Sequence, residues 1–333
     1  MEKVVIALDA MGGDYAPEQT VKGAVEAVNS SDEIRVILVG KQDMIAKELE
    51  KYEYAKEDIE VVHASEIIDM GDVPTVAIKD KKDSSLVVAM RLVREGKADA
   101  LVSAGSTGAV LVGGQLVVGR LKGIKRPPLA PFIPTTKGFS LLIDCGANVD
   151  ARPEHLVQFA QMGSIYYENV MGKKNPTVAL LNIGTEEEKG NQLVKDTKPL
   201  MKECKNINYI GSVEARELVS GAADVIVCEA FVGNVVLKFF EGLALTLFGS
   251  LKEGLMSSTR TKLGALLVKP ALKGLKNQFD TSSQGGAPLL GLKGLVVKAH
   301  GNSSSKEIEI ALKQCISFKK QRINEKIKES ICD

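Results

Sequence analysis

Short β-branched runs alternate with amphipathic stretches along the whole chain, and this alternation constrains the fold more than any other feature. The runs are VVIAL (4–8), IRVILV (34–39), IEVV (59–62), DALVS (99–103), SLLID (140–144), TVALLNI (177–183), DVIVCE (224–229) and LVVKAH (295–300). Such alternation is typical of βαβ units around a mostly parallel sheet. We therefore expect an α/β fold with helices on both faces of the sheet.

Helix signals lie between the predicted strands. Pro17 and Pro153 should begin helices that run to about residues 29 and 171. Ser304 and Glu307 have the spacing of a capping box, and an apolar helical stripe follows them. These signals indicate helices at the positions that a βαβ arrangement requires.

One segment breaks the pattern. Residues 254–279 contain five basic residues and no acidic one, and their leucines recur at near-helical spacing. We expect Pro270 to divide this segment into two short helices. The preceding apolar run, 235–251, carries Lys238 and Glu241 and is shorter than the ~20 residues that a bilayer span needs. We interpret it as a buried or dimer-facing helix.

Composition indicates an ordinary globular protein. The 333 residues, 44% of them apolar, are enough for one large or two coupled α/β domains. Basic residues (43) nearly balance acidic ones (42), which argues against nucleic-acid binding. The five cysteines never have C-x-x-C spacing, and the N-terminus enters an apolar strand without signal-peptide features. A reducing cytoplasm is the natural interpretation.

Glycine, asparagine and acidic residues gather where the predicted strands end. The six loops are 9–14, 103–109, 144–150, 182–191, 228–236 and 299–304. Ligands of open parallel sheets bind beyond the carboxyl ends of the strands. We therefore expect these loops to share one crevice.

The loop SAGSTGA (103–109) suits a small oxyanion. Gly105 and Gly108 allow close backbone approach, and hydroxyl and N–H groups at the start of the next helix can donate to an anion. Neither a P-loop nor a dinucleotide fingerprint occurs in the chain. Structural capping of a strand-to-helix turn is the competing interpretation.

Acidic residues of the loops have two interpretations. They could bind a divalent ion, but their spacing matches no known metal site, so we favour helix capping and the holding of loop N–H groups, and we predict no metal. These residues are Asp9, Asp14, Asp144, Asp150, Glu186 and Glu229.

Three further polar residues and two thiols are candidates for chemistry. Lys189 is either a solvated surface charge or the cation that neutralises a bound anion. His300 and Asn234 could each cap a helix or donate to an oxyanion. Cys145 and Cys228 end strands but have no recognisable base, so we expect inert buried thiols and no covalent catalysis.

Eight motifs in order resemble the bacterial phosphate acyltransferase family, the acyl-[acyl carrier protein]:phosphate acyltransferases that begin phospholipid synthesis. The motifs are VVIALDAMGGDYAP, SAGSTGA, RPPLAPFIPT, DCGANVD, NIGTEEEKGN, EAFVGNVVLK, GGAPLLGLKG and AHGNSS. The resemblance covers nearly the whole chain.

The resemblance implies transfer of a long acyl chain from acyl carrier protein to inorganic phosphate. The acyl phosphate formed is then consumed by a membrane glycerol-3-phosphate acyltransferase. The implied fold is a three-layer α/β/α Rossmann-like sheet, related to phosphate acetyltransferases and isocitrate-dehydrogenase-type enzymes, in a homodimer without a cofactor. We expect one such domain over residues 1–333, with the basic helical segment inserted at about 254–279, in a cytoplasmic protein peripherally associated with the inner face of the cell membrane.

The resemblance also suggests roles for the loop residues. Ser103, Ser106, Thr107 and Gly108 would hold phosphate, Lys189 would offset its charge, and Asn234 and His300 would donate to the tetrahedral oxyanion or the departing thiolate. The wider substrate-binding set consists of Asp9, Gly12, Gly13, Gly105, Asp144, Asn148 and Glu229.

The resemblance suggests a binding partner for each of two basic regions. Residues 100–143 contain no acid, and this strip could dock the acidic carrier protein or be plain solvated surface; its basic residues are Arg120, Lys122, Lys125, Arg126 and Lys137. Residues 254–279 resemble the amphipathic tip by which the family touches membranes, and a dimer-packing hairpin is the rival interpretation. The expected membrane contacts are Leu263, Leu266, Leu267 and Leu272.

Other functions remain open at this point. One is a short-chain phosphate acyltransferase that uses acyl-coenzyme A, and another is a dehydrogenase of the related fold. A third is a non-catalytic, membrane-associated scaffold for lipid enzymes.

Overall fold

The computed structural model describes residues 3–279 and 284–331, and the chain divides into two compact units. Unit 1 comprises Met1–Pro131, Gln161–Asn175 and Ser282–Asp333, and unit 2 comprises Phe132–Ala160 and Pro176–Thr281. Each unit has its own sheet, whereas the sequence led us to expect a single sheet in a single domain.

Unit 1 contains a six-stranded sheet with the order β10-β11-β4-β1-β2-β3. Its strands are β1 (Val4–Asp9), β2 (Ile34–Gly40), β3 (Ile59–His63), β4 (Ala100–Ser103), β10 (Ala287–Pro288) and β11 (Leu295–Lys298). All pairs are parallel except β10 with β11. Because β11 pairs with β4, Lys298 lies opposite Ser103.

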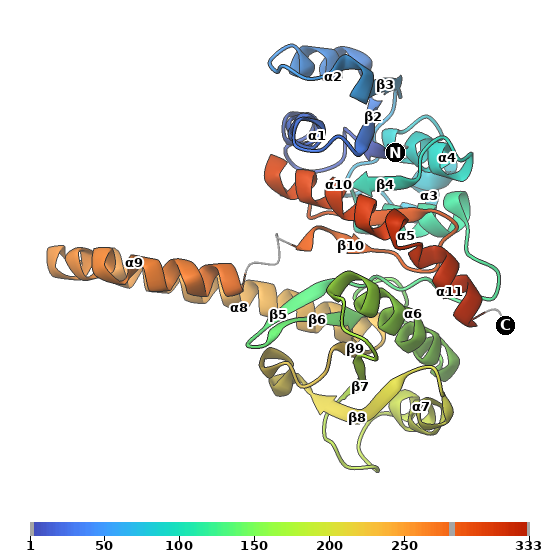
Figure 1. The fold of residues 1–333 in the computed structure, drawn as a ribbon, viewed down its shortest axis with the longest axis vertical. Coiled ribbons are helices and arrows are strands. Elements are labelled where there is room, and N and C mark those ends of the chain that lie inside the picture. The colour runs from blue at the N-terminus through green and yellow to red at the C-terminus, as the bar shows by residue number, and fades with distance from the viewer. Residues whose placement is uncertain (1–2, 280–283, 332–333) are drawn as a thin grey trace. The chain divides into compact units, whose positions relative to one another are not determined.

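Helices cover both faces of this sheet. They are α1 (Glu18–Asn29), α2 (Gln42–Leu49), η1 (Lys56–Asp58), α3 (Pro74–Asp80), α4 (Ser85–Arg94), α5 (Thr107–Gly113), η2 (Gly114–Val118), α10 (Ser305–Lys320) and α11 (Ile323–Ile331). Helices α1 and α10 pack together on one face, and α4 packs on the other (Figure 1). The predicted capping box is confirmed, since Ser304 Oγ accepts the Glu307 N–H and Glu307 accepts the Ser304 N–H.

Unit 2 contains a five-stranded sheet with the order β5-β6-β9-β7-β8. Its strands are β5 (Phe132–Thr135), β6 (Gly138–Ile143), β7 (Thr177–Asn182), β8 (Asn208–Glu214) and β9 (Val225–Val227). Its helices are α7 (Gln192–Glu203), η3 (Ala215–Ser220), α8 (Ala230–Met256) and α9 (Thr259–Gln278), whereas α6 (Pro153–Met171) begins in unit 2 and belongs to unit 1 from Gln161 on. Residues from the start of α8, including Val232 and Val236, pack on the apolar core of this unit.

The eight strands expected from the sequence are all present, and the mostly parallel α/β class is confirmed. The three strands that the pattern missed, β5, β8 and β10, each lie at the edge of a sheet. An edge strand needs less apolar sequence and tolerates proline. Pro134 lies in β5 and Pro288 in β10, and both would ordinarily argue against a strand.

Two expectations about the helical segment of unit 2 are wrong. Pro270 does not divide it, because α9 continues through this residue as one helix. The chain instead turns at Ser257 and Ser258, where Ser258 Oγ accepts the Thr261 N–H at 3.2 Å as a helix cap does.

The apolar run 235–251 is also not buried in the chain itself. It belongs to α8, which is 27 residues long, strongly apolar and largely exposed along its apolar stretch. By length and composition α8 is therefore able to cross a membrane, although the sequence argument treated the run as too short. The helix packs along α9, and residues near its start, such as Val236 and Leu237, pack on the core of unit 2, while most of the run is exposed.

Candidate functional site

Three of the predicted loops meet at the carboxyl ends of the unit 1 strands. A Cβ atom on Gly12 would lie 2.4 Å from Asp9 Oδ2 and 2.8 Å from the Gly105 nitrogen, so loops 9–14 and 103–109 touch at a position that only glycine permits. The Asp14 N–H donates to the Gly301 carbonyl at 2.7 Å, which joins loop 299–304 to the same cluster. The convergence of these three loops confirms part of the expected arrangement.

Asp9 lies buried at the centre of this cluster. Its Oδ2 accepts a 2.7 Å hydrogen bond from Ser103 Oγ, which in turn accepts the Gly105 N–H at 3.1 Å. Oδ1 has no hydrogen-bond partner of normal geometry in the part of the chain that the structure describes. Burial raises the pKa of the Asp9 carboxyl, and the nearby Ser85 and Ser103 hydroxyls, the Met11 amide and the charge of Lys298 offset part of this rise.

Lys298 is a member of the cluster that the sequence analysis missed. It ends β11, is only 9% exposed, and donates from Nζ to the Ala104 carbonyl at 3.4 Å and to the Ala299 carbonyl. A positive charge thus lies within hydrogen-bond distance of the backbone of the SAGSTGA loop. The available signal was a lysine inside the apolar run LVVKAH, because a charge in a buried strand needs a polar role.

The residues of the SAGSTGA loop divide into two kinds. Ser103 already donates to Asp9, so it positions the loop and offers no free proton to a ligand. Ser106 precedes α5, and its buried hydroxyl makes no capping bond. Thr107 and Gly108 open α5, and a Cβ on Gly108 would lie 2.5 Å from Pro74 Cγ of α3. Ser106 and the first N–H groups of α5 are therefore the donors that can serve an anion.

The unit 2 loops use their acids for local structure. Asp144 accepts the Ala147 N–H at 3.2 Å, the Asn148 N–H at 2.8 Å and the Asn148 side-chain amide at 2.8 Å. Glu229 caps α8 by accepting the Phe231 and Val232 N–H groups. Glu229 is therefore a helix cap and Asp144 holds loop N–H groups, which supports the structural interpretation of these two acids. Asn234 is not a cap, because it is the fifth residue of α8, and its side chain is exposed.

The loop of Lys189 is held by another lysine that the sequence analysis missed. Lys198 is 3% exposed and donates from Nζ to the carbonyl groups of Glu186, Glu187 and Lys189 at 2.9, 2.8 and 3.1 Å. Lys189 itself is exposed and makes no ion pair within the described residues. The charge of Lys189 is thus available to a bound anion, while Lys198 holds the backbone of the loop in place.

The remaining candidates differ in accessibility. His300 follows β11, as expected, and is exposed.

Burial raises the pKa of both the Cys145 and Cys228 thiols well above the ordinary value, which disfavours a thiolate nucleophile. Among residues 3–279 and 284–331, no three His, Cys, Asp or Glu side chains gather as metal ligands would.

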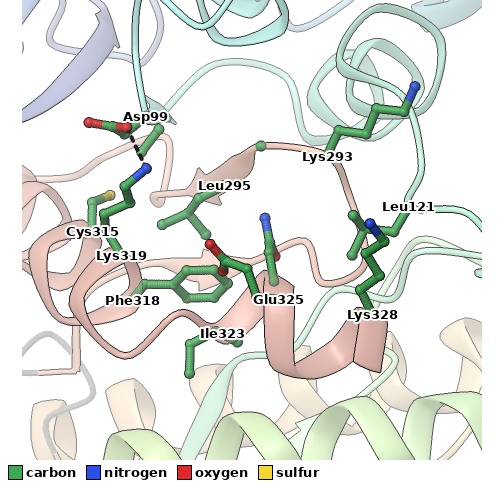
Figure 2. Close-up of a pocket in the computed structure, with 13 residues that line it drawn as sticks. Asp99, Leu121, Lys293, Leu295, Cys315, Phe318, Lys319, Ile323, Glu325 and Lys328 are labelled. Atoms are coloured by element: carbon green, nitrogen blue, oxygen red, sulfur yellow. Dashed lines mark ion pairs between the residues drawn. The ribbon is translucent and has the colours of Figure 1, made fainter. Parts of the chain in front are cut away.

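A cavity of about 230 Å³ lies at the amino ends of strands β4 and β11 of unit 1, away from the loop cluster at their carboxyl ends (Figure 2). Ala100 and Leu295, the first residues of β4 and β11, line it together with Leu121, and Lys319 pairs with Asp99 at 2.8 Å beside it. The cavity is therefore separate from the loop cluster. The exposed basic residues that flank Leu121 are Arg120, Lys122, Lys125 and Arg126.

The buried carboxyl leads to a prediction about stability. Because the folded-state pKa of Asp9 is raised above 3.8, ionisation of Asp9 destabilises the fold increasingly as the pH rises. We expect Asp9→Asn to raise the midpoint of thermal unfolding at pH 7.5 by about 2 °C or more, and by less at pH 4. Calorimetry at both pH values measures this difference. An equal gain at the two values would contradict the assignment.

Among solved structures, the fold is similar to that of a phosphotransacetylase from Streptococcus pyogenes. The TM-score is 0.64, the identity is 17%, and the match covers 94% of this chain and 93% of that one. At this identity the likeness shows the fold alone, an α/β architecture that phosphotransacetylases use.

Sequence comparisons establish the family. A family model described as fatty acid synthesis protein matches residues 4–326. A phosphate acyltransferase of Alkaliphilus oremlandii (strain OhILAs) is 54% identical over 326 residues, 98% of this chain and 97% of that protein. Another, from Clostridium acetobutylicum, is 49% identical over 328 residues, 98% and 99% of the two chains. The chain therefore belongs to the phosphate acyltransferase family of fatty acid and phospholipid synthesis, and it is an acyltransferase.

Proposed function

We propose that this protein transfers a long-chain acyl group from acyl carrier protein to inorganic phosphate. The acyl phosphate would then supply phosphatidic acid and phospholipid synthesis through a membrane glycerol-3-phosphate acyltransferase. One observation carries the proposal: Asp9, Ser103 and Lys298 form a buried cluster directly beneath a glycine-rich loop. Such a cluster holds the loop in place and puts a positive charge near it. An anion site requires both.

The chemistry needs no nucleophilic side chain. The second ionisation of phosphate lies near neutrality, as it does in its esters, so the HPO₄²⁻ ion is abundant at pH 7. One of its oxygens attacks the thioester carbonyl carbon, a C–O bond forms, and the C–S bond breaks. The proton of HPO₄²⁻ passes to the departing thiolate, so the products are acyl phosphate and a free thiol. Positioning and charge stabilisation dominate such a reaction.

We assign roles in this reaction as follows. Ser106 and the N–H groups of Thr107 and Gly108 bind phosphate, and Lys298 supplies fixed positive charge behind them. Gly12, Gly13 and Gly105 allow the backbone to approach the anion. Lys189 is the proposed second cation, and Asn234 and His300 are the proposed donors to the oxyanion or the leaving thiolate.

The proposed donor partner is acidic acyl carrier protein. The exposed side chains of Arg120, Lys122, Lys125 and Arg126 form a basic surface in a stretch without acids, which suits electrostatic steering of this partner. This surface lies at the amino ends of β4 and β11. Docking there therefore requires the flexible prosthetic arm of the carrier to reach the carboxyl ends of these strands, where the loop cluster lies.

The test is phosphate-dependent release of carrier-protein thiol from palmitoyl-acyl carrier protein, with hydroxylamine trapping of the acyl phosphate. Release that requires phosphate and yields a trappable acyl group would support the proposal. Equal or faster turnover of acetyl-coenzyme A would favour a short-chain enzyme instead. Binding to liposomes without any release would favour a scaffold.

The α8–α9 hairpin is the proposed membrane contact. Leu263, Leu266 and Leu267 of α9 are 65%, 67% and 84% exposed, and basic residues surround them. An apolar helical face with basic flanks suits an anionic lipid surface. Packing within a homodimer is the competing role for this surface. We also propose that the protein is a homodimer, whichever role this surface has.

We expect Leu266→Glu with Leu267→Glu to abolish flotation with vesicles that contain phosphatidylglycerol, because two carboxylates would enter the apolar layer. The matched control is Leu116→Glu, which places the same charge at an exposed leucine of unit 1. Flotation equal to that of the unmodified protein would reject membrane contact at this face. Loss of dimers in size-exclusion chromatography would assign the face to dimer packing.

A further inference from the structure

The segment between β3 and α4 exposes three large apolar side chains. Met70 is 53% exposed, Val73 62% and Val76 53%, although each belongs to a residue type that usually lies inside. Val73 and Val76 lie three residues apart at the start of α3, so they share one face of that helix. This surface is defined here as the α3 ledge, residues Met70, Val73 and Val76.

The α3 ledge is held in place from behind. Lys81 donates to the Ile67 carbonyl at 2.9 Å and forms an ion pair with Asp72. The Asp69 N–H donates to Asp72 Oδ2 at 2.9 Å. On the opposite side of α3, Ala77 and Ile78 are buried, and the helix packs against α5. The exposed side chains are therefore presented by a fixed backbone.

The α3 ledge lies next to the candidate anion site. A Cβ on Gly108 would lie 2.5 Å from Pro74 Cγ, so α3 starts against the first turn of α5. A Cβ on Gly301 would lie 3.1 Å from Met70 Cε and 3.5 Å from both Asp14 carboxylate oxygens. Met70 of the α3 ledge thus lies against loop 299–304, and Pro74, between Val73 and Val76 in sequence, lies against loop 103–109.

We propose that the α3 ledge holds the alkyl chain of the thioester substrate while its carbonyl carbon lies at the phosphate. This inference rests on the proposed function and adds a chain-binding surface to it. A long-chain acyl donor must keep its alkyl chain on apolar protein surface next to the reacting carbonyl. The α3 ledge supplies such surface, because Met70 lies against loop 299–304 and the neighbouring Pro74 lies against loop 103–109.

Charge argues for the alkyl chain over the carrier protein as the occupant. Residues 66–84 contain five acidic and three basic residues, and the Asp69 side chain beside Met70 is 79% exposed. An acidic carrier protein would be repelled by this surface. An uncharged alkyl chain carries no such penalty.

The test compares donors of two chain lengths on acyl carrier protein, palmitoyl and hexanoyl, at saturating phosphate. The variant is Met70→Ser with Val73→Ser and Val76→Ser, and the control is Met44→Ser, an exposed methionine of α2. We expect kcat/KM for the palmitoyl donor to fall about tenfold or more, and for the hexanoyl donor less than about twofold, because only the long chain loses buried area. The KM for phosphate should stay unchanged.

A second variant, Val73→Thr with Val76→Thr, preserves side-chain shape and protects the test against misfolding. It should reduce the palmitoyl rate by about threefold, in proportion to the smaller apolar area lost. Equal losses with both chain lengths, or no loss with either, would overturn the inference. A loss seen with palmitoyl-carrier protein but absent with palmitoyl-pantetheine would overturn it in favour of carrier docking. If the unmodified protein itself shows no phosphate-dependent release, the proposed function fails instead.

Discussion

Lys298→Met should lower kcat/KM for phosphate by about 100-fold, the size of effect seen when one preorganised charge or donor is removed from an acyl-transfer site. Lys298 is buried against the Ala104 and Ala299 carbonyl groups, directly beneath the proposed phosphate loop. Methionine has a similar length and no charge, so it removes the positive charge without leaving a large cavity. Steady-state rates of thiol release at varied phosphate concentration measure the effect.

Two controls separate catalysis from folding. Lys293→Met removes an exposed lysine from the loop just before β11 and should leave the rate within about twofold of normal, because exposed charges contribute little. Circular dichroism and the midpoint of thermal unfolding show whether Lys298→Met is folded. A folded Lys298→Met variant with normal kinetics would remove Lys298 from the site. Lys189→Ala tests the proposed second cation in the same assay.

Gly233→Ala should have the largest effect on stability. A Cβ at this position in α8 would lie 1.9 Å from the Asp144 carbonyl oxygen and 2.9 Å from Cys228 Sγ. The carbonyl belongs to the backbone after β6 and cannot move aside as a flexible side chain can, so α8 must shift. Overpacking costs about 1–3 kcal/mol, and a clash with backbone puts this variant at the upper end of that range. Calorimetry should show a midpoint of thermal unfolding lower by roughly 6 °C or more.

Gly249→Ala is the matched control, because Gly249 lies in the same helix and a Cβ there would meet no heavy atom within 4 Å. Alanine restricts the unfolded chain and favours helix, so this variant should be more stable by about 0.5–1 kcal/mol. If both variants lost stability to the same degree, the close approach at Gly233 would not be the cause.

Local sequence determined most of the elements and the glycine-rich loops of the candidate site. The β-branched runs predicted eight strands, and the proline and capping-box signals predicted the starts of α1, α6 and α10. Glycines at 12, 13, 105 and 108 marked loops of close backbone approach, and these loops do meet in unit 1. Such features depend on residues that are near in sequence, so a single chain reveals them.

Sequence reasoning failed where a side chain's role depends on distant neighbours. Ser103 was expected to serve phosphate directly, but its hydroxyl donates to Asp9, 94 residues away. Asn234 was expected at a helix start, but Glu229 occupies the capping position. The wider proposal of one crevice shared by six loops stays a prediction, with three loops in each unit.

The sequence by itself determined the α/β class and the order of the strands along the chain, and it marked SAGSTGA as a candidate anion-binding loop. Only the tertiary structure decided that the strands form two sheets and that β11 pairs with β4. That pairing brings Lys298 to Ala104 across 194 residues of sequence and makes a buried cation part of the candidate site. The physical reason is that hydrophobic periodicity fixes which face of an element is buried, whereas strand order fixes which side chains meet.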